Sequence, residues 1–281
     1  MIHIVTDTTT QLTASEIKKH HIQLVSLQVL FEGQTYKDQV DMSSQEFSNI
    51  LETKAEFPTT SQPSMGDFVK TYQDIIDADP DAQIISIHIA GVLSGTSSTA
   101  AVAAQQFDHQ IATINSTSAA RGTAYLVLKA AQLAEAGADF ATIVQRVNQL
   151  ANSTKLYLFI NNLDYLVKGG RASKAAGFIS SIIKLKPVIT LENDELQFKY
   201  KCRGKKQQRK IENQIVAEII ANPKVKDVGL PFVDDDREVR EIAAEILEAR
   251  PDINTVISYV SPSLMPHAGP AGFAIIYNDQ F

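Results

Sequence analysis

The clearest pattern in the chain is an apolar run that stops at small hydroxyl residues, from Ile84 to Ala101. Isoleucine fills four of the six positions 84–89, which predicts a buried strand. Small helix-forming residues follow Thr96, so a loop and then a helix are predicted. The helix would begin near Ser94, Gly95 and Thr96, where unpaired backbone N–H groups and the helix dipole favour an anion. Capping the helix is the commoner role of such hydroxyls, and this stretch alone leaves both roles open.

Strands that end in polar tips and lead into helices recur through the first half of the chain. Further strands are predicted at Ile2 to Val5, Gln23 to Phe31 and Gln110 to Ile114, and helices at 119–136 and 140–151. A capping box, Thr13 with Glu16, predicts one more helix start. This alternation predicts right-handed crossovers and a mainly parallel sheet with helices on both faces. Because ligands of such sheets bind beyond the carboxyl ends of the strands, the tips near Asp7, Ser94 and Asn115 are expected to line one crevice.

Three hydroxyl residues, Thr59 to Ser61, lie between Pro58 and Pro63. Proline restricts its own backbone and that of the residue before it, so this segment is predicted to be extended. Ser64 then caps the next helix. An ordinary polar connection is the simpler interpretation of the three hydroxyls, and a contribution to an anion site is the alternative.

From residue 154 onward the pattern changes to hairpins beside helices. A strand is predicted at Leu156 to Ile160, helices at Leu163 to Lys168 and Ala175 to Ile183, and a hairpin at Pro187 to Leu191 and Leu196 to Lys201. This predicts an α+β domain with an antiparallel sheet, hence two domains, 1–153 and 154–281, with a ligand between them. The apolar helix either walls a tunnel between the domains or packs in the core, and its periodicity does not decide which.

His267 has the most constrained setting of the histidines, a loop bounded by Pro266, Gly269 and Pro270. A histidine in a rigid loop is a better candidate for chemistry than one on an apolar face. The other five histidines have no comparable setting and are interpreted as core or surface residues.

Composition narrows the function of this 281-residue chain. A net charge of −6 argues against a protein that binds nucleic acid. The sequence contains no run of 18 apolar residues, so no membrane-spanning segment is predicted. Cys202 is the only cysteine, no spacing matches a metal site, and no glycine-rich motif predicts ATP or a dinucleotide, so no metal or cofactor is expected. The N-terminal pattern is not that of a signal peptide, and a cytoplasmic location is expected. The one basic cluster, Lys199 to Lys210, is either a solvated face or a docking surface for an acidic partner.

Two functions compete on these residues. In one, Ser94 is the nucleophile of a serine hydrolase or esterase, His267 its base and Asp7 the orienting carboxylate, although no G-x-S-x-G motif supports it. In the other, the chain binds a molecule with an anionic headgroup and an apolar tail. Hydroxyls of Ser61 and Ser94, with Thr96, and a cation from His267 or Arg171 would hold the headgroup.

Several motifs occur together in the order and spacing of one known family. They are Val5-Thr6-Asp7, Pro58-Thr59-Thr60-Ser61-Gln62-Pro63-Ser64, Leu93-Ser94-Gly95-Thr96, 163–171 (LDYLVKGGR), Lys186-Pro187, Arg203-Gly204-Lys205-Lys206 and His267-Ala268-Gly269-Pro270. On these motifs the chain resembles DegV-family proteins over essentially its whole length.

The resemblance implies the two-domain DegV fold, related to the dihydroxyacetone kinase substrate domain, with one long-chain fatty acid such as palmitate or oleate buried between the domains. It also implies a partner, an ATP-binding fatty acid kinase subunit that phosphorylates the carboxylate presented to it. By motif, the carboxylate would be held near Thr60, Ser61, Ser94, Gly95, Thr96 and His267. Asp7, Asn115, Arg171 and Arg203 would support the headgroup or face the partner. A lipid-binding protein without catalysis of its own is therefore expected.

The chain departs from the family pattern at two positions. Asn115 stands where aspartate is usual, and Ala271 stands where many members have a second glycine after the histidine. The first change removes a charge from the crevice, and the second restricts the backbone beside His267.

Overall fold

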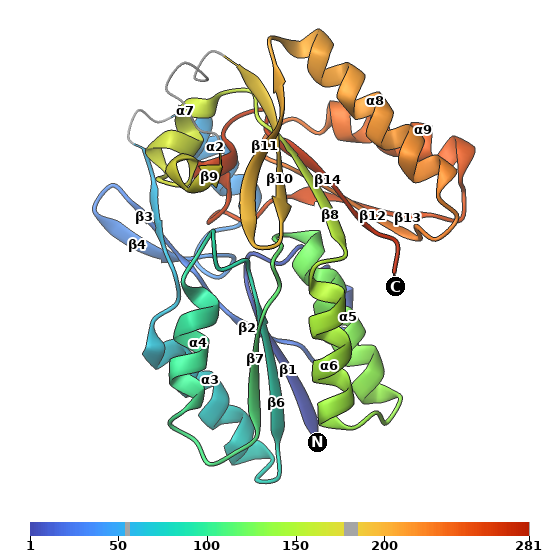
Figure 1. Ribbon diagram of the computed structural model, residues 1–281. Helices are drawn as coiled ribbons and strands as arrows, with labels where there is room; N and C mark the ends of the chain where they lie inside the picture. Colours follow the sequence, from blue (N-terminus) through green and yellow to red (C-terminus); the bar gives the residue numbers. More distant parts are fainter. Residues whose placement is uncertain (54–56, 177–184, 281) are drawn as a thin grey trace.

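The first half of the chain forms a parallel sheet between two pairs of helices. The computed structural model describes residues 1–53, 57–176 and 185–280 (Figure 1). The sheet has the order β2 (Gln23–Val25), β1 (Ile2–Asp7), β6 (Gln83–His88) and β7 (Ile111–Asn115). One face packs against α3 (Met65–Ala78) and α4 (Thr96–Ala104), the other against α5 (Arg121–Glu135) and α6 (Phe140–Ala151). Because helices cover both faces, β6 is buried almost throughout, as the sequence predicts.

A seven-stranded sheet forms most of the second half. Its order is β13 (Asn254–Tyr259), β12 (Asp227–Phe232), β14 (Phe273–Asn278), β8 (Thr154–Phe159), β10 (Lys186–Glu192), β11 (Glu195–Cys202) and β9 (Ala175–Ala176). The pairs β12–β13 and β11–β9 are parallel and the others antiparallel. Helices α8 (Lys205–Ala221) and α9 (Arg237–Ala249) pack on one face. The mixed α/β class expected from the sequence is confirmed.

The predicted single strand from Gln23 to Phe31 is wrong, because the chain changes sheets within it. The part after β2 forms β3 (Gln28–Phe31), the centre of a small antiparallel sheet of order β4–β3–β5. Its other strands are β4 (Gln34–Lys37) and β5 (Thr59–Ser61), and α2 (Ser44–Thr53) follows β4. The extended segment predicted after Pro58 is therefore β5, which pairs with β3 and places Ser61 opposite Gln28.

Two further predictions in the second half need correction or lie outside the described residues. His267 is in the short helix α10 (Met265–Ala268) rather than in a loop, because backbone N–H groups there bond carbonyls three to four residues earlier. Of the apolar helix predicted from Ala175 to Ile183, Ala175 and Ala176 form β9, and residues 177–183 lie outside the described residues. The remaining elements are α1 (Ala14–Lys19), α7 (Leu163–Lys168) and the 3-10 turn Ala172–Lys174. No helix within the described residues is long and apolar enough to cross a membrane.

Arg121, the first residue of α5, links α1 of the first half of the chain to β12 of the second. Its side chain is 1% exposed, donates from Nε and Nη2 to the carboxylate of Asp227, and forms an ion pair with Glu16. Gly229 permits this contact, since a Cβ there would lie 2.3 Å from the Cβ of Arg121. Buried arginine pairs of this geometry are costly to break, so the two halves are held in a fixed relation. Sequence reasoning missed Arg121, whose partners lie about a hundred residues away along the chain.

Candidate functional site

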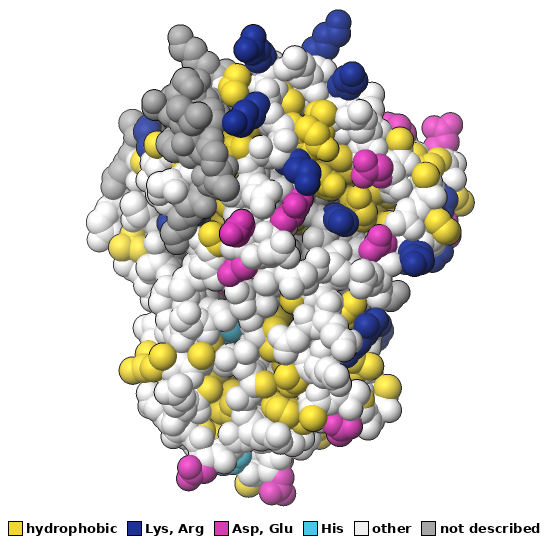
Figure 2. Space-filling model, in the orientation of Figure 1, with side chains coloured by type: hydrophobic (Ala, Val, Ile, Leu, Met, Phe, Trp, Pro, Cys, Tyr) yellow, Lys and Arg dark blue, Asp and Glu magenta, His cyan; other side chains and the backbone are white. Residues whose placement is uncertain are grey.

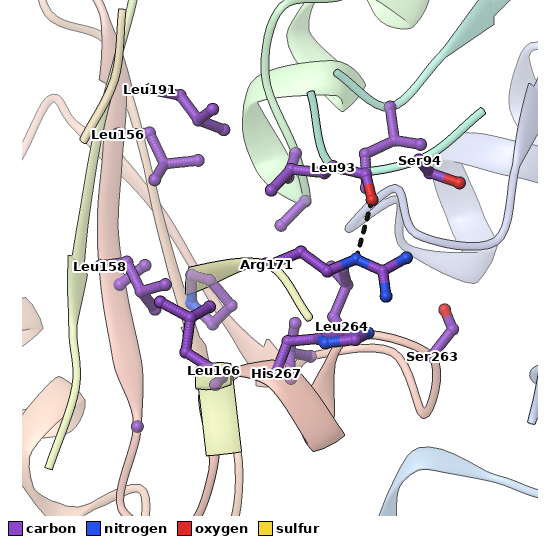
Figure 3. A pocket seen from close by; sticks show the side chains of 18 of the residues that line it. Leu93, Ser94, Leu156, Leu158, Leu166, Arg171, Leu191, Ser263, Leu264 and His267 are labelled. Carbon is purple, nitrogen blue, oxygen red and sulfur yellow. Dashed lines mark hydrogen bonds between the residues drawn. The ribbon is translucent and has the colours of Figure 1, made fainter. Parts of the chain in front are cut away.

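A cavity lies between the two large sheets, and only a few of its lining side chains are polar. These are Thr60, Ser61, Gln62, Ser94, Arg171, Ser263 and His267. The apolar lining includes Leu27, Leu93, Leu156, Leu158, Leu166, Leu191, Leu196 and Leu264. In Figure 3 the guanidinium of Arg171 points toward the side where Ser94 and Ser263 lie, and Leu156 and Leu191 lie on the opposite side. The cavity therefore has a polar side and an apolar side.

Ser94 reaches the cavity because it ends the loop between β6 and α4. The N-cap of α4 is Gly95, and no side chain caps this helix. The hydroxyl of Ser94 lies instead 2.8 Å from that of Thr96, which is fully buried and does not line the cavity. The structure thus rules out side-chain capping, one of the two roles that the sequence left open for these hydroxyls. Gly95 follows Ser94, and its lack of a side chain leaves room for Gln62. A Cβ at Gly95 would lie 2.3 Å from the Oε1 of Gln62.

Thr60 and His267 form a polar pair at the edge of the cavity. The Oγ1 of Thr60 lies 3.0 Å from the Nε2 of His267, and the next hydroxyl, that of Ser61, donates to Gln28. The Nδ1 of His267 is buried without a hydrogen-bond partner among the described residues. Burial, and then the nearby charge of Arg171, lowers the pKa of His267 to about 3. His267 is therefore neutral at physiological pH and is not the cation of this site.

Arg171 supplies the positive charge of the cavity. Its Nε donates to the carbonyl oxygen of Leu93 at 3.0 Å, and its Nη1 donates to that of Gly169 at 2.7 Å (Figure 3 shows the first bond). Among the described residues, no carboxylate lies within ion-pair distance of its guanidinium. Burial lowers its pKa, although a guanidinium keeps its charge at any physiological pH. A partly buried cation in an apolar cavity is costly unless an anion accompanies it.

Asp7 does not belong to this cavity. It is fully buried, and its carboxylate lies 3.0 Å from the Nδ1 of His88 and accepts bonds from Thr9 and from the backbone of Ile89. Burial alone would raise the pKa of Asp7, but these contacts, His88 foremost, bring it below its ordinary value. The hydroxyl of Ser86 lies 2.6 Å from the other nitrogen of His88. Asp7 therefore stabilises the interior of the parallel sheet.

The Ser94, His267 and Asp7 arrangement that a hydrolase would need is not formed. Ser94 contacts Thr96, His267 contacts Thr60, and Asp7 contacts His88. The chain does hold a serine, a histidine and an aspartate in series, Ser86, His88 and Asp7, but all three are fully buried and no substrate can reach them.

Asn115 and Arg203 also lie outside the cavity lining. Asn115 holds neighbouring loops together, and its Nδ2 donates to the carboxylate of Asp194 at 2.9 Å, which an aspartate would not do. Arg203 is exposed, and its backbone N–H donates to Gln207. Of the three side chains expected to line one crevice, Asp7, Ser94 and Asn115, only Ser94 therefore lines the cavity.

The basic cluster predicted at 199–210 spans the end of β11 and the start of α8. Several of its charges are paired: Lys199 contacts Glu192 at 2.7 Å, and Lys205 contacts Glu238. In Figure 2 most of the Lys and Arg side chains on the visible face lie on the half of the molecule that carries these elements. The cluster is thus solvated and partly neutralised by acidic neighbours, which fits either of the two interpretations.

Ser263 and Gln62 line the cavity and were not predicted as site residues. The hydroxyl of Ser263 donates to Asp38, a carboxylate 1% exposed that also accepts from Thr8. Burial raises the pKa of Asp38 to about 7 against the effect of these two donors. No local pattern indicates this cluster, because its members come from three distant segments. No group of three or more metal-ligating side chains occurs in the parts of the chain that the structure describes.

The fold and the cavity define an α/β protein with an apolar chamber between two sheets. The chain belongs to the DegV family, because the sequence model of that family, which is described as "Uncharacterised protein, DegV family", matches residues 1–279. A DegV domain-containing protein of Staphylococcus aureus strain MRSA252 is 32% identical over 273 residues, 97% of each chain. A similar protein of Listeria innocua is 32% identical over 282 residues, 98% of each chain.

Two solved structures carry the comparison further. DegV from Bacillus subtilis, described as a fatty acid binding protein, has a TM-score of 0.92 at 26% identity over 99% of both chains. A DegV family protein from Thermus thermophilus, whose structure is described as one of fatty acid binding, has a TM-score of 0.88 at 26% identity over 99% of both chains.

Proposed function

We propose that the chain binds one long-chain fatty acid, such as palmitate or oleate, in the cavity between residues 1–153 and 154–281. The separation of polar and apolar sides within the cavity supports this proposal, because an amphipathic ligand needs both. The relatives from Bacillus subtilis and Thermus thermophilus, which are described as binding fatty acids, support it as well.

Arg171 is the single observation that carries the proposal. It is a cation at an apolar cavity, and no carboxylate of the described residues pairs with it. A carboxylate ligand would complete this pair and remove the cost of burying the charge. The tail of the same ligand would then fill the leucine-lined side, where each buried methylene contributes ~0.8 kcal/mol.

The hydroxyls of Thr60, Ser61 and Ser94 would turn from their present partners, His267, Gln28 and Thr96, to donate to the carboxylate beside Arg171. Gly95 and Thr96 do not line the cavity and would contribute indirectly, by shaping the loop that carries Ser94. His267 would contribute as a neutral hydrogen-bonding group, since burial holds its pKa far below physiological pH. The chain would therefore bind its ligand with one full positive charge and several neutral donors.

We further propose that the bound carboxylate is presented to a separate ATP-binding fatty acid kinase subunit, and that the protein acts in the cytoplasm. A carboxylate held by hydroxyls and a single cation stays accessible to an incoming phosphoryl group. The resemblance of the site motifs to the family, with exposed Arg203 as a contact for the partner, supports this role. The chain itself would then supply binding and orientation, without a metal or cofactor of its own.

The test is the lipid content of the purified protein and its variants, measured by native mass spectrometry after gentle desalting and by lipid extraction. We expect one acyl chain per wild-type molecule. Arg171→Gln, Ser94→Ala and Ser61→Ala should each retain less fatty acid while staying folded, with a melting temperature lowered only by the lost ligand. Ser98→Ala is the matched control, because Ser98 is exposed on α4, the helix that follows Ser94.

Two results would count against this function. Full lipid occupancy in Arg171→Gln together with both serine variants would remove the assigned headgroup site. Rapid cleavage of p-nitrophenyl esters by the wild type, abolished in Ser94→Ala, would instead indicate the hydrolase.

A further inference from the structure

Three loops meet where the β10–β11 hairpin touches the first half of the chain. The Nδ2 of Asn115 donates to the carboxylate of Asp194 at 2.9 Å, and the backbone N–H of Val92 donates to the same carboxylate at 3.3 Å. The Oδ1 of Asn115 accepts from the N–H groups of Gly91 and Thr117 at 3.1 and 3.0 Å. We call this set of bonds the Asn115–Asp194 clasp.

The hairpin turn positions the carboxylate of Asp194 to accept from Asn115 and Val92. Asn193 and Asp194 are the only residues between β10 and β11, and both have a positive φ, of 53° and 58°. Two such residues form a type I′ turn, which keeps the strands close and the turn tight. Gly91 lets the turn approach, because a Cβ there would lie 3.0 Å from Asp194 and 3.1 Å from Asn115.

Each of the three loops in the clasp also supplies wall residues of the cavity. Val92 is followed by Leu93 and Ser94, and the turn after Asn115 leads to 119–120. The hairpin turn lies between Leu191 and Leu196. Movement of any loop would therefore change the width of the cavity on this side.

This is the apolar side of the cavity. In Figure 3 Leu191 and Leu156 lie opposite the side chains of Ser263 and His267, with Arg171 between the two groups. A ligand whose charged end is at Arg171 directs its tail toward these leucines. The clasp holds the wall that such a tail would meet.

We propose that the Asn115–Asp194 clasp sets the upper limit on the length of the acyl chain that this protein accepts. This inference rests on the proposed fatty-acid binding. Each methylene that finds room in the cavity raises the affinity ~4-fold, whereas one that does not fit has to displace the hairpin against the clasp. Affinity thus rises with chain length up to the length at which the tail reaches the hairpin, and falls beyond it.

The test is a series of dissociation constants for saturated fatty acids from lauric to arachidic acid, measured on delipidated protein. In Asn115→Asp the donor of the clasp becomes a second carboxylate facing Asp194, so the two repel. We expect the tightest-binding chain to become longer by about two methylenes, with a matching ~4-fold gain per added methylene. The double variant Asn115→Asp/Asp194→Asn reverses donor and acceptor and should restore the wild-type optimum.

Two further variants complete the design. Asn148→Asp makes the same change of charge at an exposed site on α6 and should leave the optimum unchanged. Asp194→Gly removes the clasp carboxylate without adding a charge, and glycine suits the positive φ at that position. It should lengthen the optimum as Asn115→Asp does, and it serves as the test if Asn115→Asp does not fold.

The outcomes separate the two proposals. An unchanged optimum in Asn115→Asp and Asp194→Gly, even with a lower melting temperature, would mean that the clasp stabilises the fold and does not limit chain length. A lengthened optimum that the double variant fails to restore would also overturn the role of the Asn115–Asp194 pair. A wild-type protein that binds neither oleate nor any member of the series would overturn the proposed function itself, and this inference with it.

Discussion

Glu212 on α8 should make the stability of the protein fall as the pH rises. Its side chain is 2% exposed, and it faces Glu238 of α9. Burial, and then the neighbouring Glu238, raises the pKa of Glu212 to about 8, although Arg209 at 2.8 Å acts in the opposite direction. Glu212 therefore keeps its proton in the folded protein near neutral pH, whereas an unfolded chain would release it.

The size and the sign of the effect follow from this difference. The pKa rises from 4.5 to about 8 on folding, and one unit corresponds to 1.36 kcal/mol, which gives an upper limit of ~4–5 kcal/mol. Of this difference, the part between pH 6 and pH 8, about two pH units or ~2–3 kcal/mol, should be lost when the pH is raised from 6 to 9.5. The folded state binds the proton more tightly, so the stabilisation is complete below the unfolded pKa and is lost as the pH rises through 8.

Denaturant unfolding of the wild type and of Glu212→Gln at about pH 6 and about pH 9.5 measures this effect. Glutamine resembles the protonated acid but does not titrate, so the variant should already be the more stable protein at pH 6, which lies above the unfolded pKa of 4.5. Its advantage should grow by ~2–3 kcal/mol between the lower and the higher pH. The difference in the free energy of unfolding between the two proteins, taken at each pH, cancels the contribution of other titrating groups, such as Asp38. Glu241→Gln, at an exposed partner of Arg209, is the control and should change stability equally at both values.

A stability difference between the wild type and Glu212→Gln that is the same at both pH values would refute this reasoning. It would mean that Glu212 is ionised in the folded protein throughout, and that its ion pair with Arg209 outweighs the cost of burial.

Three further predictions rest on single observations. Ala271 has a φ of +52°, so Ala271→Gly should raise the free energy of unfolding by ~0.5–1 kcal/mol, measured by denaturant titration. Arg121→Met should lower it by ~3 kcal/mol, because two carboxylates lose their partner, and Arg121→Lys should recover only part of the loss in the same titration. In Gly169→Ala the new Cβ would lie 2.2 Å from the Nδ1 of His267, so fatty-acid affinity should fall at least ~10-fold by titration calorimetry. Gly66→Ala, with ordinary contacts in α3, should leave that affinity unchanged. A variant of Ala271 less stable than wild type, full recovery in Arg121→Lys, or unaltered affinity in Gly169→Ala would contradict the respective argument.

Local signals in the sequence predict most elements of the fold but not which sheet each strand joins. The capping box of Thr13 and Glu16 forms as expected, since it involves only neighbours in the chain. The segment from Gln23 to Phe31 shows the limit. Its alternation continues across the break between β2 and β3, and β2 joins β1 whereas β3 joins β5. The partners that decide this lie elsewhere in the sequence, so periodicity does not reveal the change.

The same distinction applies to the site. The sequence singled out Ser94 and Arg171 as hydroxyl and cation near the ends of elements, and the structure brings both to one cavity. Asp7 has an equally suggestive position at the end of β1, yet it turns into the sheet interior because His88, 81 residues later, lies beside it. Ser263 gave no signal, since its role depends on Asp38 from the other half of the chain. The direction in which a polar side chain points and the partner that it contacts depend on the tertiary structure.

The loop from Gly91 to Gly95 joins the two ends of the proposed ligand. Its central carbonyl, that of Leu93, fixes Arg171 and hence the charge that meets the carboxylate. Near its start, the backbone N–H of Val92 donates to Asp194 of the β10–β11 hairpin, and this hairpin bounds the apolar side of the cavity. A tail too long for the cavity would therefore strain the loop that presents Ser94, and poor fit at one end would weaken binding at the other. Because the loop bonds both walls, headgroup recognition and chain length are expected to be coupled, so that the penalty for an overlong chain should shrink in Arg171→Gln as well as in variants of the clasp.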